Sequence, residues 1–382
     1  MSAALDELTR ALAATAVARD RAGGTAKAER DAIRRSGLLT LAVPTAFGGQ
    51  GAGWPEILGA VRSLARVDSS LAHLFAFQHL MVASVLLYGH PGQQDRLLTA
   101  TANGPLFWGN ALNPLDRRTH LTADGDGFRL NGVKSFCSGA SDSDLLLVSA
   151  DDADGVLRVL ALPTARPGVA VLDDWDNMGQ RQTDSGTVTF TDVRVEADDL
   201  LGPPGPYGGP ASSLRPCVAQ AILASIYLGI AEGALAEAAA FTRDQSRPWR
   251  TSGVASAAED PYVLRHYGEF HVAVAGAGAL AERALARLQQ AWDGRATLTP
   301  EQRGAAALAI ATFKVAAARA ALDVSNRLFE VTGARATAAR HGFDRFWRNV
   351  RTHSLHDPID YKLKELGAWA LTGALPEPGF YS

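Results

Sequence analysis

The chain has 382 residues, of which 47% are hydrophobic and 20% are charged, a composition typical of a soluble globular protein with two or three packed units. A formal net charge of -3 argues against DNA, RNA and anionic lipid as partners, because binding them takes clustered positive charge. Cys137 and Cys217 are too few for a disulfide framework and too isolated for a zinc knuckle, so we expect a cytoplasmic protein.

The N-terminal third is predicted to form a helical domain over residues 1–110. Its first residues lack the basic flank and apolar core of a secretion signal, and we find no stretch of roughly 18 apolar residues that would suggest a membrane partner. Ala- and Leu-rich segments run from Leu5 to about Leu98, with breaks at Val43-Pro44 and Phe47–Gly51. Ser69 and Ser70 are expected to cap a helix whose first turn contains His73.

Residues 111–211 are predicted to form a small central β-domain. Phe128–Phe136 is expected to contain a turn, whereas Leu145–Ser149 and Thr187–Val195 are typical of strands. Leu201–Pro210 is rich in Gly and Pro, which predicts a linker or surface loop at the end of this domain.

The pattern becomes helical again over residues 212–382. Ile222, Ile226 and Ile230 recur at a spacing of four, and two long Ala-rich stretches follow, in which alanine favours helix and close helix packing. We expect a bundle of four or more helices, with a helix beginning at Pro300 and a loop over Trp249–Asp260.

Polar and charged side chains gather in the segment Phe343–Pro358, which holds three arginines, two histidines and two aspartates. On a helical turn His353 and His356 would share a face and project into one cavity. This spacing is compatible with structural histidines, with acid/base groups that work near neutral pH, or with a metal site completed by Asp357. The spacing matches no metalloprotease motif, and we expect no metal.

Other candidates are isolated in the sequence. His73 is either a core residue or a pocket imidazole, and Ser138 lies where a strand meets Gly139 and could offer its hydroxyl to a planar ring. Arg247 and Arg335 are candidate phosphate clamps, although solvated arginines are the simpler interpretation. The sequence contains no dinucleotide-binding GxGxxG motif in a βαβ context and no Walker motif.

Several strings resemble those of the flavin-dependent dibenzothiophene monooxygenases, a group with the acyl-CoA dehydrogenase fold. The resemblance runs from Ala16 to Phe380, and its most specific strings are Gly37–Leu39, Ala72–Phe75, Phe136–Ala140, Arg181–Gly186, Tyr227–Ala231 and Gly342–Pro358.

This resemblance implies a mainly α protein with a central β-domain, in which a helical N-terminal domain, a β-barrel-like middle domain and a C-terminal four-helix bundle assemble as a homotetramer. It also assigns roles to individual residues. The implied cofactor and peroxide contacts are Asn110 and Ser138 at the flavin ring, Arg247 and Arg335 at its phosphate from different subunits, and His73, His353 and His356 around its C4a atom, with His73 on the wall opposite the other two. Phe77, Phe136 and Trp175 are the implied substrate-pocket residues.

The activity implied by the resemblance is that of a two-component monooxygenase. Such an enzyme receives reduced FMN from a separate NADH-dependent flavin reductase and reacts with dioxygen to give a C4a-hydroperoxyflavin. The substrate would be an aromatic thioether such as dibenzothiophene or benzothiophene, oxidised to sulfoxide or sulfone in a cavity that excludes water. His356 is the expected proton donor, with His353 in support.

Two departures keep alternatives open. Where related dehydrogenases use a Glu as base, this chain has Asp357 followed by Pro358, so an FAD-dependent acyl-CoA dehydrogenase is the competing hypothesis. Where the sulfur-oxidising group has a tyrosine and two histidines, this chain has Phe77, Gln78 and His79. Because the first two positions are expected to line or approach the pocket, indole or another heteroaromatic is an alternative substrate.

Overall fold

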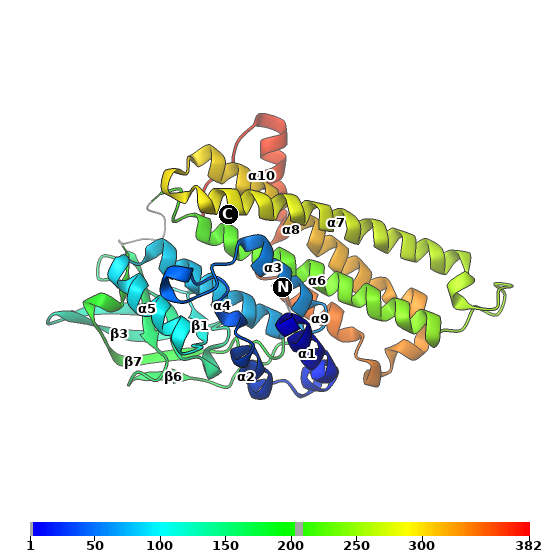
Figure 1. Ribbon diagram of the computed structural model, residues 1–382, viewed down its shortest axis with the longest axis horizontal. Coiled ribbons are helices and arrows are strands. Elements are labelled where there is room, and N and C mark those ends of the chain that lie inside the picture. Colours follow the sequence, from blue (N-terminus) through cyan, green and yellow to red (C-terminus); the bar gives the residue numbers. More distant parts are fainter. Residues whose placement is uncertain (1–2, 203–208) are drawn as a thin grey trace.

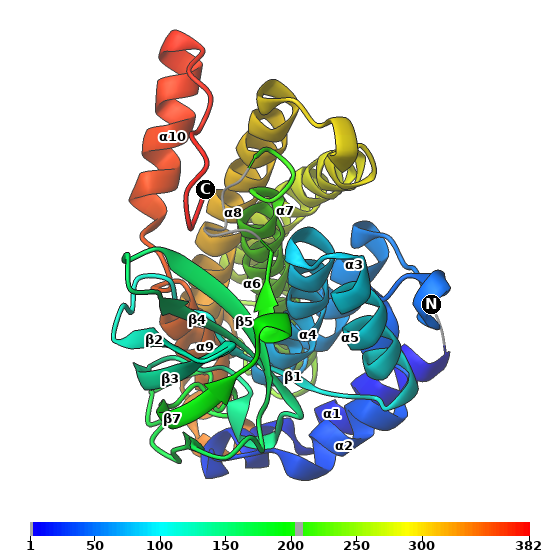
Figure 2. The ribbon, with the colours of Figure 1, turned by 90° about the vertical axis from the view of Figure 1, so that its left-hand side faces the viewer.

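The structure, a computed structural model, describes residues 3–202 and 209–382, and it has the predicted order of helices, sheet and helices (Figure 1). The N-terminal helices are α1 (Ala3–Ala22), α2 (Lys27–Arg35), α3 (Trp54–Ala65), α4 (Ser69–Tyr88) and α5 (Pro91–Asn103). They cover one side of the sheet and one end of the long C-terminal helices (Figures 1 and 2).

The central sheet is mostly antiparallel. Its strands are β1 (Trp108–Ala111), β2 (Thr119–Asp124), β3 (Gly127–Lys134), β4 (Leu145–Asp151), β5 (Leu157–Pro163), β6 (Val169–Val171), β7 (Val188–Val195) and β8 (Leu200–Leu201). Their order is β6-β7-β3-β2-β4-β5-β8, and β1 pairs with β4 in parallel. Alternate apolar side chains of β3, β4, β5 and β7 form the separate core of this domain, as a half-buried strand pattern requires.

The C-terminal part is a helical bundle, as expected. Its helices are α6 (Leu214–Asp244), α7 (Pro261–Asp293), α8 (Pro300–Thr332), α9 (Asp344–His353) and α10 (Ile359–Thr372). Helix α8 begins at Pro300 as predicted, because Thr299 caps it and proline needs no N–H at that position. Helix α6 packs against α3, α4 and α8, which fixes one end of the bundle beside the sheet.

Helix α4 departs from the prediction at its first residue. The side chain of Asp68, and not that of Ser69 or Ser70, caps the helix by accepting a hydrogen bond from the N–H of Leu71 at 3.0 Å. Both serines are themselves helical and buried, so His73 lies beyond the first turn. A carboxylate also interacts more favourably with the positive end of the helix dipole than a hydroxyl does.

Most of Phe128–Phe136, where a turn is expected, is strand: β3 runs without interruption to Lys134, and the chain bends only at Ser135. At Asn131-Gly132 the pairing of β3 with β7 shifts register as a β-bulge. Gly132 has φ 129°, and a Cβ atom at this position would lie 2.1 Å from the carbonyl oxygen of Arg118. The glycine therefore serves close strand approach and not a hairpin.

Three helices correct the expectation that no segment could span a membrane. By length and composition alone, α4, α6 and α8 are apolar enough to do so. In this fold 89%, 83% and 67% of their most apolar windows are buried inside the protein, so their hydrophobicity is that of a large core. Of the predicted linker Leu201–Pro210, residues 203–208 lie outside the described residues.

Candidate functional site

A cavity of about 660 Å³ lies where the sheet, helix α4, the start of α6 and the C-terminal residues meet. This volume is within the range of pockets that enclose a cofactor or drug-sized ligand. The lining is largely apolar, with Leu80, Leu112, Val159, Leu223 and Phe380 among its residues. Polar groups are therefore few, and their positions define what the cavity can bind.

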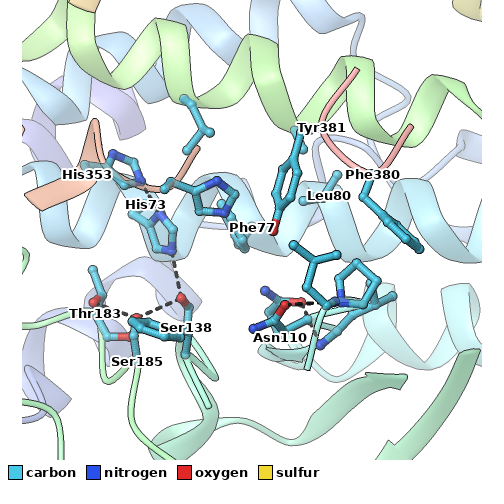
Figure 3. A pocket seen from close by; sticks show the side chains of 18 of the residues that line it. His73, Phe77, Leu80, Asn110, Ser138, Thr183, Ser185, His353, Phe380 and Tyr381 are labelled. Atoms are coloured by element: carbon cyan, nitrogen blue, oxygen red, sulfur yellow. Dashed lines mark hydrogen bonds between the residues drawn. The ribbon is translucent and has the colours of Figure 1, made fainter. Parts of the chain in front are cut away.

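One wall carries a continuous row of hydrogen bonds between side chains from four segments of the chain (Figure 3). His353 Nε2 lies 3.0 Å from His73 Nδ1, and His73 Nε2 lies 3.0 Å from Ser138 Oγ. Ser138 Oγ is 2.8 Å from Ser185 Oγ, which is 2.8 Å from Thr183 Oγ1. His73 and His353 are thus direct neighbours, which corrects the expectation that His73 lies on the opposite wall.

The far end of this row gives it a direction. Thr183 Oγ1 donates to the carbonyl oxygen of Gln180 at 2.9 Å, so it accepts from Ser185. Ser138 then donates to Ser185, His73 donates from Nε2 to Ser138, and His353 donates from Nε2 to Nδ1 of His73. The lone pair of His353 consequently resides on Nδ1, a buried atom with no hydrogen-bond partner among the described residues.

Both histidines in the row are neutral at pH 7. Burial, together with the charge of His356, lowers the pKa of His73 to about 3. Burial and the neighbouring His73, His356 and Lys314 lower the pKa of His353 well below its ordinary value. Neither residue is therefore a cationic proton donor, and the lone pair on His353 Nδ1 can accept a hydrogen bond from a ligand.

His356 differs from His353 in position. Helix α9 ends at His353, and His356 lies in the turn that follows, so the two residues do not share a helical face. Both nevertheless line the cavity, and the side chain of His356 is 38% exposed. Its Nδ1 lies 3.2 Å from Oδ1 of Asp357, and its ring meets that of Tyr381 edge-on at 5.5 Å.

Asp357 is bound by a lysine that the sequence did not single out. Lys314 Nζ donates to Asp357 Oδ1 at 2.6 Å and to Gln220 Oε1 at 2.5 Å, and all three side chains are buried. Burial would raise the pKa of Asp357, but His356 and Lys314 lower it well below its ordinary value. The Asp357 carboxylate is therefore a poor base. Within residues 3–202 and 209–382, no group of His, Cys, Asp and Glu side chains is placed to hold a metal ion.

The expected substrate-pocket residues all line the cavity. Phe77 stacks on His73 with ring centroids 4.0 Å apart. Phe136, with φ 60°, is 61% exposed and meets Trp175 edge-on at 6.1 Å. Asn110 also lines the cavity, and its backbone N–H donates to the carbonyl of Ser138.

Gln78 and His79 do not line the cavity. Gln78 is buried, where its side chain accepts from the N–H of Trp108 at 2.9 Å and donates to the carbonyl of Leu106 at 3.1 Å. His79 packs edge-on against Phe75, and burial lowers its pKa to about 3. The expectation that Gln78 approaches the pocket is wrong, because α4 turns this residue toward the start of the sheet.

Arg247 and Arg335 lie away from the cavity of their own chain. Gln220 lines the cavity near the start of α6, and Arg247 follows Asp244 at its other end, so the helix separates them by roughly 35 Å. Arg335, which follows α8, donates a hydrogen bond to the carbonyl of Gln245 at the end of α6, close to Arg247 in the sequence. The loop that follows α6 lies at the far end of the bundle in Figure 1.

The site also contains residues that the sequence analysis missed as site residues, namely Gln180, Thr183, Ser185, Gln220, Thr352 and Tyr381. Among them, Gln180 Oε1 and Thr352 Oγ1 are buried atoms with no hydrogen-bond partner in the described chain, as is His353 Nδ1. Orphaned polar atoms at a cavity wall are costly unless a ligand pairs with them. A planar ring with N–H and C=O groups along its edge has the required chemistry.

Family models match the chain in three consecutive parts. They describe the N-terminal domain (residues 2–105), middle domain (residues 110–193) and C-terminal domain (residues 221–361) of acyl-CoA dehydrogenases. The expected fold class is thereby confirmed.

Individual relatives are similar over nearly the whole chain. The probable FMNH2-dependent monooxygenase SfnC of Pseudomonas putida is 55% identical and aligns over 98% of this chain and 96% of its own. Dibenzothiophene monooxygenase of Rhodococcus erythropolis is 47% identical over 97% and 92% of the two chains. The solved structure of methanesulfinate monooxygenase MsuC from Pseudomonas fluorescens is 52% identical, covers 100% of both chains and superposes with a TM-score of 0.98. The chain therefore belongs to the flavin-dependent monooxygenases of the acyl-CoA dehydrogenase family.

Proposed function

We propose that the protein uses reduced FMN and dioxygen to oxidise the sulfur atom of a small organosulfur compound, with an aromatic thioether such as dibenzothiophene or benzothiophene as first candidate. The observation that carries the proposal is the cavity itself. It is largely apolar and large enough for a flavin ring with a small substrate, and its row of neutral hydrogen-bonding groups lies along one wall.

The residues present fit a flavin ring. Gln180 Oε1 and the lone pair of His353 Nδ1 can accept from ring N–H groups, and Thr352 Oγ1 can donate to a ring carbonyl. Ser138, within the row, and Asn110, whose N–H donates to the carbonyl of Ser138, complete the proposed ring contacts. When bound, reduced FMN supplies the activation of dioxygen and the transfer of one oxygen atom to sulfur.

The side chains of this protein then have separate tasks. His73 and His353, held neutral by burial, keep the wall polar without adding charge to it. Phe77 and Trp175 exclude water and offer flat surfaces to an aromatic substrate. His356 faces the same cavity from a partly exposed turn. It can therefore take a proton from solvent and deliver it to the second oxygen atom of dioxygen, which is released as water.

The sequence has no nicotinamide-binding motif, so we expect FMN to be reduced by NADH on a second protein. We propose a separate NADH-dependent flavin reductase as the source of reduced FMN, and FAD as a weaker alternative cofactor. We further propose a homotetramer in which Arg247 and Arg335 reach a flavin phosphate from different subunits. Their distance from the cavity of their own chain supports this arrangement. The proposed location is the cytoplasm, with no membrane or nucleic acid as partner.

Acyl-CoA dehydrogenation is the less favoured alternative. It needs a carboxylate that removes a proton from the substrate, whereas Asp357 is paired with Lys314 and holds its proton poorly. The relatives of this chain, in contrast, include monooxygenases named for two kinds of sulfur substrate, the aromatic thioether dibenzothiophene and methanesulfinate.

A substrate panel tests the proposal. The protein is combined with a flavin reductase, NADH and FMN, and consumption of dibenzothiophene, benzothiophene, indole and methanesulfinate is measured with and without dioxygen. We expect oxygen-dependent conversion of a sulfur compound to its S-oxide. Conversion of none of the sulfur compounds, or oxidation of indole alone, would contradict the proposed substrate class.

A further inference from the structure

The buried ion pair between Lys314 and Asp357 contacts two residues that line the cavity, Gln220 and His356, but neither partner is itself a lining residue. Helix α8 supplies Lys314, helix α6 supplies Gln220, and Asp357 follows the turn after α9. The side chains of Lys314 and Asp357 are only 2% and 6% exposed. A buried ion pair is seldom more stabilising than apolar residues of the same size, so stability alone does not account for it.

One oxygen of Asp357 links this pair to the cavity. Oδ1 accepts from Lys314 Nζ at 2.6 Å and lies 3.2 Å from Nδ1 of His356. A charged carboxylate can only accept hydrogen bonds, so His356 carries its proton on Nδ1 whenever this contact is made. The nitrogen left to exchange a proton with a molecule in the cavity is Nε2.

The two charges of the pair act on His356 in opposite directions. The carboxylate attracts a positive charge on the imidazole ring, and the ammonium of Lys314 repels it. Burial lowers the pKa of Lys314 to about 8, and the Asp357 carboxylate counteracts this, so the lysine is charged at pH 7. The other titratable groups that face this cluster are His73, Tyr227, His353, Lys362, Glu365 and Tyr381.

We propose that Asp357 and Lys314 are positioning residues for His356. Asp357 fixes the His356 tautomer that presents Nε2 to the cavity, and Lys314 holds the carboxylate ionised while offsetting its charge. The position at which related dehydrogenases carry a catalytic base thus serves here to orient a proton donor. This inference rests on the proposed function for its catalytic meaning but not for its geometry.

The test measures the reaction of His356 with diethyl pyrocarbonate in flavin-free protein across a pH series, by peptide mass spectrometry. The reagent modifies neutral imidazole, so the pH midpoint of modification reports the charge of His356. In Asp357→Asn we expect this midpoint to fall by about one unit, and in Lys314→Met to rise by a similar amount. His120, an exposed residue on β2, is the internal control whose midpoint should stay constant.

Two further variants separate positioning from folding. Lys314→Arg keeps both charges and should keep the wild-type midpoint. Lys314→Met/Asp357→Asn leaves no unpaired buried charge, so it should fold even where a single variant does not, and its midpoint should return toward the wild-type value. Shifts of equal sign in the two single variants, or a double variant that does not return, would overturn the proposal.

Turnover distinguishes this inference from the proposed function. With a sulfur substrate, Asp357→Asn should lower kcat at least roughly tenfold, shift its pH profile to lower pH and leave KM within about twofold. Opposite modification shifts without any sulfur oxidation in the wild type would support the positioning role and reject the function. Sulfur oxidation with an unshifted midpoint would reject the positioning role alone.

Discussion

Arg30 joins the N-terminal helices to the site, and its loss should be among the most damaging single substitutions. Its side chain is fully buried in α2 and contacts Asp184 Oδ2 at 3.0 Å, the carbonyls of Gly139 and Asp142 at 2.9 and 2.8 Å, and the ring of Phe107 at 4.6 Å. These contacts fix both segments that carry the serines of the cavity wall. Arg30→Met keeps much of the apolar volume and removes every one of the polar contacts.

The magnitude follows from the partner that stays behind. The side chain of Asp184 is 4% exposed, so the variant contains a buried carboxylate without its cation. Breaking a buried ion pair in this way costs roughly 3–5 kcal/mol of unfolding free energy. Burial already raises the pKa of Asp184 against the opposing charge of Arg30, and without Arg30 the pKa rises further.

The sign of the pH dependence is then fixed. Because its pKa is higher in the folded state, Asp184 binds protons on folding, so stability falls as pH rises from the ordinary aspartate value through the folded value. In Arg30→Met the folded-state pKa of Asp184 is higher still, so the pH range over which stability falls reaches to higher pH. The difference in unfolding free energy between wild type and Arg30→Met should therefore be larger at pH 8 than at pH 5.

Urea unfolding followed by circular dichroism at the two pH values measures this difference. Arg34→Met is the matched control, because Arg34 lies one turn along α2 and also contacts Asp142 but is 17% exposed. We expect the control to lose about 1 kcal/mol or less. A loss below about 1 kcal/mol for Arg30→Met, or the same loss at both pH values, would refute the account of a stranded carboxylate.

Other substitutions test separate parts of the structure. Ser138→Ala should lower the free energy of unfolding by about 1–3 kcal/mol, because it leaves the buried Nε2–H of His73 without an acceptor, and it should lower turnover at least roughly tenfold; unchanged turnover would remove Ser138 from the catalytic wall. The free energy of unfolding of the wild type should fall as pH drops from 6.5 toward 3, because the folded protein holds His73 neutral. His73→Phe should reduce this slope by about 1.4 kcal/mol per pH unit, and an unaltered slope would contradict the depressed pKa of His73. Gly233→Ala should destabilise the protein by about 1–3 kcal/mol, since the added Cβ would lie 1.9 Å from the carbonyl oxygen of Arg66. Gly268→Ala, with open space around it, should not, and equal unfolding midpoints of the two variants would refute this packing.

Much of the fold could be predicted because each part has a distinct local pattern. The Ala-rich stretches and the helix that begins at Pro300 follow from helix propensity and capping. The turn expected within Phe128–Phe136 does not interrupt the strand at Asn131-Gly132, because this dipeptide occurs in both hairpins and bulges, and only the neighbouring strand decides between them. Asp68 was missed because an aspartate and two serines are all good caps.

The site could be predicted only in part. The resemblance places His73, Ser138 and His353 at the flavin, but it does not give the hydrogen bonds that join them in one row. These bonds link residues 65 and 280 positions apart, and no local sequence pattern reports such contacts. Lys314 was missed because lysines are usually exposed. A signal was present, since Ile310, Ala317 and Ala318 surround it at helical spacing and are all buried.

A single turnover with isotopic oxygen tests the central claim most directly. The protein is mixed anaerobically with photoreduced FMN and a sulfur substrate that the panel identifies, without reductase, and ¹⁸O2 is then admitted. The proposed function predicts an S-oxide that carries one ¹⁸O atom per oxygen transferred, and no product when ¹⁸O2 is withheld. Product oxygen drawn from water, or anaerobic reduction of protein-bound flavin by an acyl-CoA, would contradict it.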